Sequence, residues 1–201
     1  MAILVKSKTS SDNKNLWGTT WECFEDATEL YGRKFECDVA AEPLTAKCRK
    51  YFTSPDILDS LIFDRWNTAV LLNHAESVLG NVCVGLDALN LSWPDHWFCN
   101  PPFDLKGPFI RHAKWQQAQG RPGMMLLPYE PCTRWWREHL SKGVICYVPD
   151  GRYSFLERDG YTKKSGVNFP SCFVLFPSFM IKDSIHIHFE RGISSEQSKN
   201  I

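Results

Sequence analysis

The sequence lacks the features that identify membrane, secreted and zinc-binding proteins. None of its apolar runs approaches the ~20 residues of a membrane-spanning helix. The short apolar stretch at residues 2–5 is followed by a polar stretch at residues 6–15, unlike a signal peptide. The eight cysteines form neither a C-x-x-C pair nor a zinc-type cluster, and His186 and His188 have no third metal ligand nearby. We therefore expect free thiols in a reducing cytoplasm, no metal site and no membrane association.

The sequence also lacks a net charge, because 23 Lys and Arg residues balance 23 Asp and Glu residues. This balance excludes a strongly basic protein that coats nucleic acid without specificity. The charges are unevenly distributed, however. Residues 51–102 carry one basic and six acidic side chains, whereas residues 103–201 carry fourteen and nine. The C-terminal half can therefore carry a local basic surface.

Hydrophobic residues make up 43% of the sequence and aromatic residues 13%, which is enough to form one sizeable core. We expect a flexible N-terminal arm at residues 1–15, one domain at residues 16–190 and a polar tail at residues 191–201. Within the domain, the apolar periodicity after a Ser-Pro cap predicts a helical insertion at residues 54–85. This insertion could extend target recognition, form a lid or mediate self-association.

Hydrophobic periodicity predicts helices that alternate with short strands. The predicted helices are residues 21–31, 44–49, 57–66, 108–119 and 133–140. The predicted strands are residues 35–41, 51–53, 82–84, 97–99, 124–128, 144–148 and 171–176. Because the last two strands are joined without a helix, the pattern favours an α/β fold whose mostly parallel sheet has an antiparallel C-terminal hairpin at its edge. Ligands bind at the carboxyl ends of such strands, which places Asp38, Asp87 and Asn100 along one rim.

The motif Asn100-Pro101-Pro102-Phe103 directly follows a predicted strand. It could be a rigid turn only, but its chemistry suits a planar amine whose lone pair is delocalised into a ring, as in adenine. The Asn100 side chain and the Pro101 carbonyl offer two acceptors for the two amino hydrogens, while Phe103 can stack on the base. These contacts would localise the lone pair toward a bound methyl donor, with no metal and no covalent enzyme intermediate.

Several further blocks occur in a fixed order around this motif. They are residues 16–24 (LWGTTWECF), 35–41 (FECDVAA), 46–48 (AKC), 51–53 (YFT), 87–103, 125–128 (MLLP) and 150–156 (DGRYSFL). Together they resemble the phage-type DNA N6-adenine methyltransferase (Dam-like) family over about residues 16–177. The sequence departs from the family pattern at Thr20, which replaces a proline, at Phe103, which replaces a tyrosine, and in the absence of a G-x-G after Asp38.

The resemblance implies a Rossmann-like S-adenosylmethionine-dependent methyltransferase fold, with S-adenosylmethionine as cofactor and an adenine in double-stranded DNA as substrate. Residues 100–103 would hold the flipped adenine. Thr19 and Trp21 would border the methionine end of the cofactor, and Asp87 its adenosine. The cofactor-binding residues that the resemblance implies are Thr19, Trp21, Asp38, Ala40, Thr53 and Asp87. The expected location is the cytoplasm of a bacterial host, where the enzyme would protect phage or prophage DNA from restriction.

A basic and aromatic loop lies between the last two predicted strands, at residues 149–170. Such a mixture can follow phosphates and stack on bases beside an extruded nucleotide. The predicted DNA-binding residues are Arg152, Tyr153, Phe155, Lys163, Lys164 and Asn168.

Two alternatives remain open at the level of the sequence. An N-P-P-aromatic turn suits any planar amine or amide, so the acceptor could be an RNA base or a protein glutamine. A relative without catalytic activity that binds nucleic acid would also keep the fold while losing cofactor binding.

Overall fold

The computed structural model describes residues 15–54, 76, 79–164 and 169–193. The predicted helix at residues 57–66 and nearly all of the predicted N-terminal arm lie outside the described residues. Most of the polar tail and of the predicted insertion at residues 54–85 do so as well. The described end of that insertion, from Val82 onward, is a strand of the main sheet, which confirms the strand predicted at residues 82–84.

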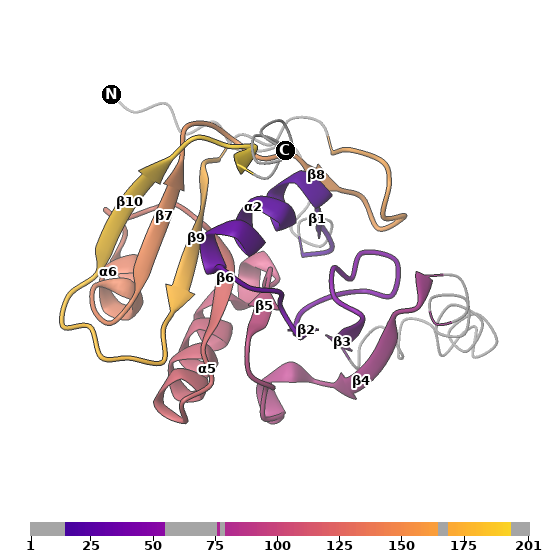
Figure 1. Ribbon diagram of the computed structural model, residues 1–201, viewed down its shortest axis with the longest axis horizontal. Helices are drawn as coiled ribbons and strands as arrows, with labels where there is room; N and C mark the ends of the chain where they lie inside the picture. Colours follow the sequence, from indigo (N-terminus) through magenta and orange to yellow (C-terminus); the bar gives the residue numbers. More distant parts are fainter. Residues whose placement is uncertain (1–14, 55–75, 77–78, 165–168, 194–201) are drawn as a thin grey trace.

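An eight-stranded mixed sheet forms the centre of the molecule, in the order β10-β7-β9-β6-β5-β2-β3-β4 (Figure 1). Its strands are β2 (Cys37–Asp38), β3 (Lys50–Thr53), β4 (Val82–Leu86), β5 (Trp97–Cys99), β6 (Gly123–Pro128), β7 (Ile145–Pro149), β9 (Ser171–Phe176) and β10 (Ile185–Phe189). Every neighbouring pair is parallel except the two pairs that β9 makes with β6 and β7. The α/β class with a mostly parallel sheet is therefore confirmed.

The predicted antiparallel pair is present as β7 and β9, but it does not lie at the edge of the sheet. Strand β9 inserts between β6 and β7, and β10 then pairs in parallel with the outer side of β7. The predicted edge position is wrong because residues 185–189, which had no predicted place in the sheet, form the edge strand β10.

The helices cover both faces of the sheet. Helices α5 (Lys106–Ala118) and α6 (Arg134–Leu140) pack on one face, and α2 (Trp21–Tyr31) packs on the other. Short 3-10 helices, η3 (Ala88–Asn90) and η4 (Phe103–Leu105), follow β4 and the N-P-P turn. A separate two-stranded antiparallel sheet joins β1 (Gly18–Thr19) to β8 (Phe155–Leu156).

The ends of α2 explain one departure from the family pattern. Thr20 caps the helix, with its hydroxyl accepting from the Cys23 N–H at 3.4 Å, a bond that a proline side chain could not make. Gly32 ends the helix with a φ of 76°, which favours glycine.

The predicted helix at residues 44–49 is wrong, because this stretch forms turns. The Lys47 N–H, which a helix would direct to the carbonyl four residues earlier, donates instead to the buried Asp38 side chain at 3.1 Å. The connection between β2 and β3 is therefore an irregular loop that is hydrogen-bonded to Asp38, the last residue of β2.

All eight cysteines are free thiols, and six of them are buried. Cys99, beside the N-P-P motif, is 0% exposed, and burial together with the charge of Asp38 raises its pKa well above the usual value. This thiol remains protonated at neutral pH and packs as a small apolar side chain.

Candidate active site

The order in which the chain adds strands to the sheet reverses between β2 and β5. From β2 the chain continues outward through β3 and β4, and then returns to add β5 and β6 on the other side of β2. Ligands of open α/β sheets bind at the carboxyl ends of strands at such a switch point. Asp38 ends β2, and Asn100 directly follows β5. The predicted rim is therefore present, and Asp87 belongs to it because its N–H donates to the Thr53 carbonyl at 3.0 Å.

The Asn100 side chain is held in one orientation. Its Nδ2 donates to the backbone carbonyl of Trp17 at 3.1 Å. The amide oxygen therefore points away from Trp17 and is available as an acceptor. Pro101 is buried, and Pro102 has no N–H that could occupy a neighbouring acceptor. The two acceptors that the sequence predicted thus lie on one rigid turn.

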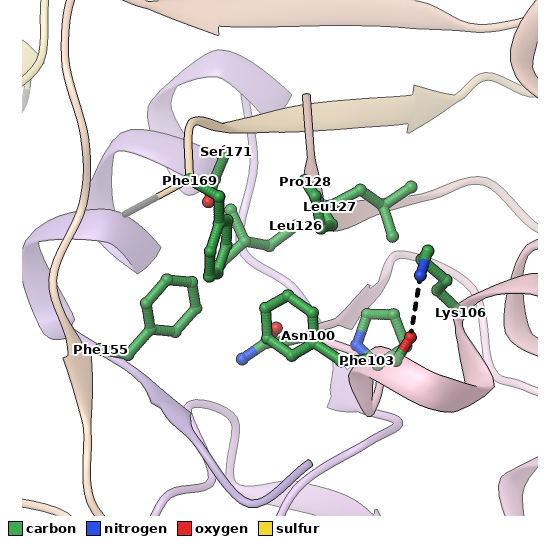
Figure 2. Close-up of a pocket in the computed structure, with 10 residues that line it drawn as sticks. Asn100, Phe103, Lys106, Leu126, Leu127, Pro128, Phe155, Phe169 and Ser171 are labelled. Carbon is green, nitrogen blue, oxygen red and sulfur yellow. Dashed lines mark hydrogen bonds between the residues drawn. The ribbon is translucent and has the colours of Figure 1, made fainter. Parts of the chain in front are cut away.

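Asn100 lines a small pocket whose other walls are mainly aromatic and apolar (Figure 2). Phe103 meets Phe169 edge-to-face at a centroid distance of 4.8 Å and meets Trp17 at 5.8 Å. Phe155 lies 5.8 Å from both Trp17 and Phe169. Aromatic side chains therefore line the pocket beside Asn100, and its volume of about 10 Å³ means that they must move apart to admit a planar base.

Side chains on both sides of the motif hold the turn that carries Phe103. The Lys106 amine donates to the Phe103 carbonyl at 3.2 Å (Figure 2). Asn15 and Asp104 exchange two hydrogen bonds, with the Asp104 N–H donating to Asn15 at 3.1 Å and Asn15 donating to the Asp104 carboxylate at 3.0 Å. These bonds join the segment before β1 to the motif, although neither residue was predicted to belong to the site.

The predicted cofactor residues lie at the ends of β1, β2 and β3, just after β2 and β4, and at the start of α2. Thr19 is buried in β1, whereas Trp21 is 56% exposed at the start of α2. The Thr53 hydroxyl is buried and has no hydrogen-bond partner among the described residues. Asp87 adopts a φ of 59° and accepts a bond from the Asn90 amide. A buried hydroxyl without a partner, next to a carboxylate on the rim, suits a ligand with several hydroxyl groups.

Asp38 shapes the loop after β2. Its carboxylate is 3% exposed and accepts from the Lys47 N–H at 3.1 Å and from the Ala40 N–H at 3.4 Å. Burial raises the pKa of this carboxyl to about 6, and the two backbone hydrogen bonds only partly offset that rise. Ala40 is half-buried beside it, and the loop after β2 contains no glycine.

The raised pKa of Asp38 predicts a specific pH dependence of stability. Between about pH 4 and pH 6 the folded protein holds a proton that the unfolded chain has lost, so stability falls as the pH rises through this window. Relative to Asp38→Asn, the free energy of unfolding of the wild type should fall by about 2 kcal/mol between pH 4.5 and pH 7. Urea unfolding at both pH values measures this, and a constant difference would contradict it.

Two of the six predicted DNA-binding residues are in the core. Tyr153 is 3% exposed and donates its hydroxyl to Asp26 at 2.6 Å, so the prediction that it contacts DNA is wrong. Phe155 is 2% exposed, so it cannot wedge into DNA from the surface and forms a wall of the Asn100 pocket instead. Both aromatic rings point inward because the chain at 152–155 alternates between exposed and buried positions as a strand does.

The remaining four residues differ in exposure. Arg152 and Lys163 are exposed and can meet a phosphate. Lys164 is half-buried, forms an ion pair with Glu157 at 2.8 Å and lies 5.8 Å from the ring centre of Trp17. Asn168 lies outside the described residues.

Among the described residues, no group of three or more His, Cys, Asp or Glu side chains could hold a metal ion. His186 instead contacts the hydroxyl of Tyr129 at 3.1 Å. Within the same described ranges, no helix is long and apolar enough to cross a membrane.

Residues 69–200 match the model of the family DNA N-6-adenine-methyltransferase (Dam), which is about two thirds of the chain. The chain belongs to the Dam family. It is an adenine-specific DNA methyltransferase of the phage type. The matched region contains the N-P-P-F motif, the aromatic pocket around it and the basic loop.

A curated relative supports this membership over a longer stretch. The DNA N-6-adenine-methyltransferase of Haemophilus phage HP1 is 22% identical to this chain over 177 residues, which cover 87% of this chain and 85% of that protein. Among solved structures, a predicted O-methyltransferase from Agrobacterium tumefaciens is similar with a TM-score of 0.40 at 15% identity. That match covers 77% of this chain and 76% of the other.

Proposed function

We propose that this Dam-family enzyme transfers a methyl group from S-adenosylmethionine to N6 of an adenine flipped out of double-stranded DNA. The observation that carries this proposal is the orientation of the Asn100 amide. Its nitrogen is occupied by the Trp17 carbonyl, so its oxygen is the atom presented to an incoming base. An acceptor at this position is what an exocyclic amine requires.

Asn100 and Pro101 would accept the two amino hydrogens of the adenine. Two acceptors draw the amine out of conjugation with the ring, which makes the N6 lone pair available for attack. When bound, S-adenosylmethionine supplies an electrophilic methyl group on a sulfonium sulfur. Transfer would form the N6–carbon bond as the carbon–sulfur bond breaks, with the demethylated cofactor as the leaving group. The Asn100 or Pro101 oxygen would hold the surplus N6 proton until it passes to solvent on product release.

Phe103 would stack on the flipped base. Its ring already contacts Trp17 and Phe169 edge-to-face, so a base that enters the pocket exchanges these contacts for a stacked one. An apolar wall also excludes water, which strengthens the bonds from the two acceptors.

The residues at the ends of β1 to β4 suit the proposed cofactor. Asp87 and the unpartnered Thr53 hydroxyl would bind the adenosine part, and Thr19 and Trp21 would border the methionine part. Asp38 and Ala40 would position the loop beneath it.

A transfer assay tests the proposed function. Labelled S-adenosylmethionine is incubated with unmethylated double-stranded DNA, with RNA and with protein, and modified nucleosides from the DNA are then separated. We expect label only in N6-methyladenine of the DNA. Label in RNA or in protein glutamine would instead support one of the other acceptors. The phage origin of the curated relative supports a role in protecting phage or prophage DNA from restriction.

The exposed loop cation Lys163 is predicted to contact a DNA phosphate. Lys163→Glu should weaken DNA binding about tenfold and reduce the salt dependence of the binding constant by about one phosphate contact. Fluorescence anisotropy with labelled duplex DNA at several salt concentrations measures both quantities. Lys182→Glu is the matched control, because Lys182 is also exposed but precedes the edge strand β10 and lies outside the basic loop. Equal losses in the two variants would contradict a local footprint.

A further inference from the structure

Lys47 is a buried lysine that forms no ion pair among the described residues. The residue is 7% exposed, and burial lowers the pKa of its amine more than the charge of Asp38 raises it. Its Nζ donates to the Thr45 carbonyl at 2.9 Å, but no carboxylate in the described part of the chain lies within ion-pair distance. Burying an ammonium whose one hydrogen bond goes to a neutral carbonyl is costly, so an anion bound next to it would stabilise this arrangement.

Lys47 lies beside two of the residues that are proposed to hold the cofactor, Asp38 and Trp21. Its backbone N–H donates to Asp38, which joins it to the carboxyl end of β2. Its Nζ lies 4.8 Å from the ring centre of Trp21, at the first turn of α2. The ammonium group is therefore placed between the loop after β2 and the start of α2, where the methionine end of the proposed cofactor would lie.

The bonding capacity of the ammonium group is only partly used. It has three donors, of which one reaches the Thr45 carbonyl, and the Trp21 ring covers another side through a cation–π contact. We propose that Lys47 binds the α-carboxylate of the methyl donor, an inference that rests on the proposed use of S-adenosylmethionine. The carboxylate would complete the coordination of the ammonium and neutralise its charge.

The interaction can be isolated by changing both partners. Isothermal titration compares wild type and Lys47→Met, each with S-adenosylmethionine and with its decarboxylated analogue, which lacks only the α-carboxylate. We expect the wild type to bind the analogue at least about tenfold more weakly. In Lys47→Met this ratio should fall to about threefold or less, because only the carboxylated ligand loses affinity.

The other outcomes separate the two proposals. A wild type that binds both ligands equally well overturns the role of Lys47 but not the use of the cofactor, and this comparison holds even if Lys47→Met fails to fold. A variant that keeps the wild-type ratio, or that loses both ligands equally, also overturns it. Binding of neither ligand by the wild type overturns the proposed cofactor itself. Lys50→Met, an exposed lysine at the start of β3, is the control and should change neither affinity.

Discussion

Asn100→Ala should reduce the rate of methyl transfer to adenine by about 10²–10³-fold, the usual cost of removing one fixed hydrogen-bonding group from a transition state. The loss should appear in kcat, because the amine carries its developing positive charge only in the transition state. Single-turnover transfer of labelled methyl groups to duplex DNA measures the effect. Affinity for S-adenosylmethionine should change less than about twofold, since Asn100 lines the pocket that is proposed to hold the adenine.

Asn100→Asp separates the orientation of the side chain from its acceptor chemistry. The aspartate keeps an acceptor but loses the donor to the Trp17 carbonyl, and it places a negative charge beside that carbonyl oxygen. Its rate should therefore lie between those of Asn100→Ala and wild type. Gln119→Ala, an exposed amide after α5, serves as the control. Equal transfer rates for Asn100→Ala and Gln119→Ala would exclude Asn100 as the group that holds the amine.

The parts of the site that could be predicted from the sequence are those that depend on local pattern. Buried apolar runs indicated β5 and β6, and strand ends followed by polar residues placed Asp38 and Asn100 at one edge. Contacts between distant segments left no such pattern. Asn100 and Trp17 are 83 residues apart, and nothing in either segment indicates that one carbonyl orients the other side chain.

The errors have physical causes of the same kind. The predicted helix at residues 44–49 failed because a buried carboxylate competes for the backbone N–H of Lys47. The prediction that Tyr153 and Phe155 contact DNA depends on the basic residues around them. The alternation of polar Arg152 and Ser154 with aromatic Tyr153 and Phe155 is the sequence signal for a strand with one face toward the core. Read with a period of two, it would have placed both rings in the core.

Asp26→Ala should lower the free energy of unfolding by about 3–4 kcal/mol, because it leaves one buried and two half-buried donors without an acceptor. The Asp26 carboxylate is 0% exposed and accepts from the Tyr153 hydroxyl at 2.6 Å, from the Gly192 N–H at 2.9 Å and from the Ile193 N–H at 2.9 Å. The Asp26 side chain on α2 therefore binds both the segment that precedes β8 and the segment that follows β10. Urea unfolding followed by tryptophan fluorescence measures the loss.

Tyr153→Phe provides the second arm of a double-mutant cycle. It removes one donor and leaves the carboxylate its two backbone N–H partners, so it should cost about 1–2 kcal/mol. The double variant should be less destabilised than the sum of the two single variants, since both remove the same bond. Glu29→Ala, an exposed position on the same helix, is the control. A loss for Asp26→Ala within about 1 kcal/mol of this control would show that the carboxylate is not what holds the three segments together.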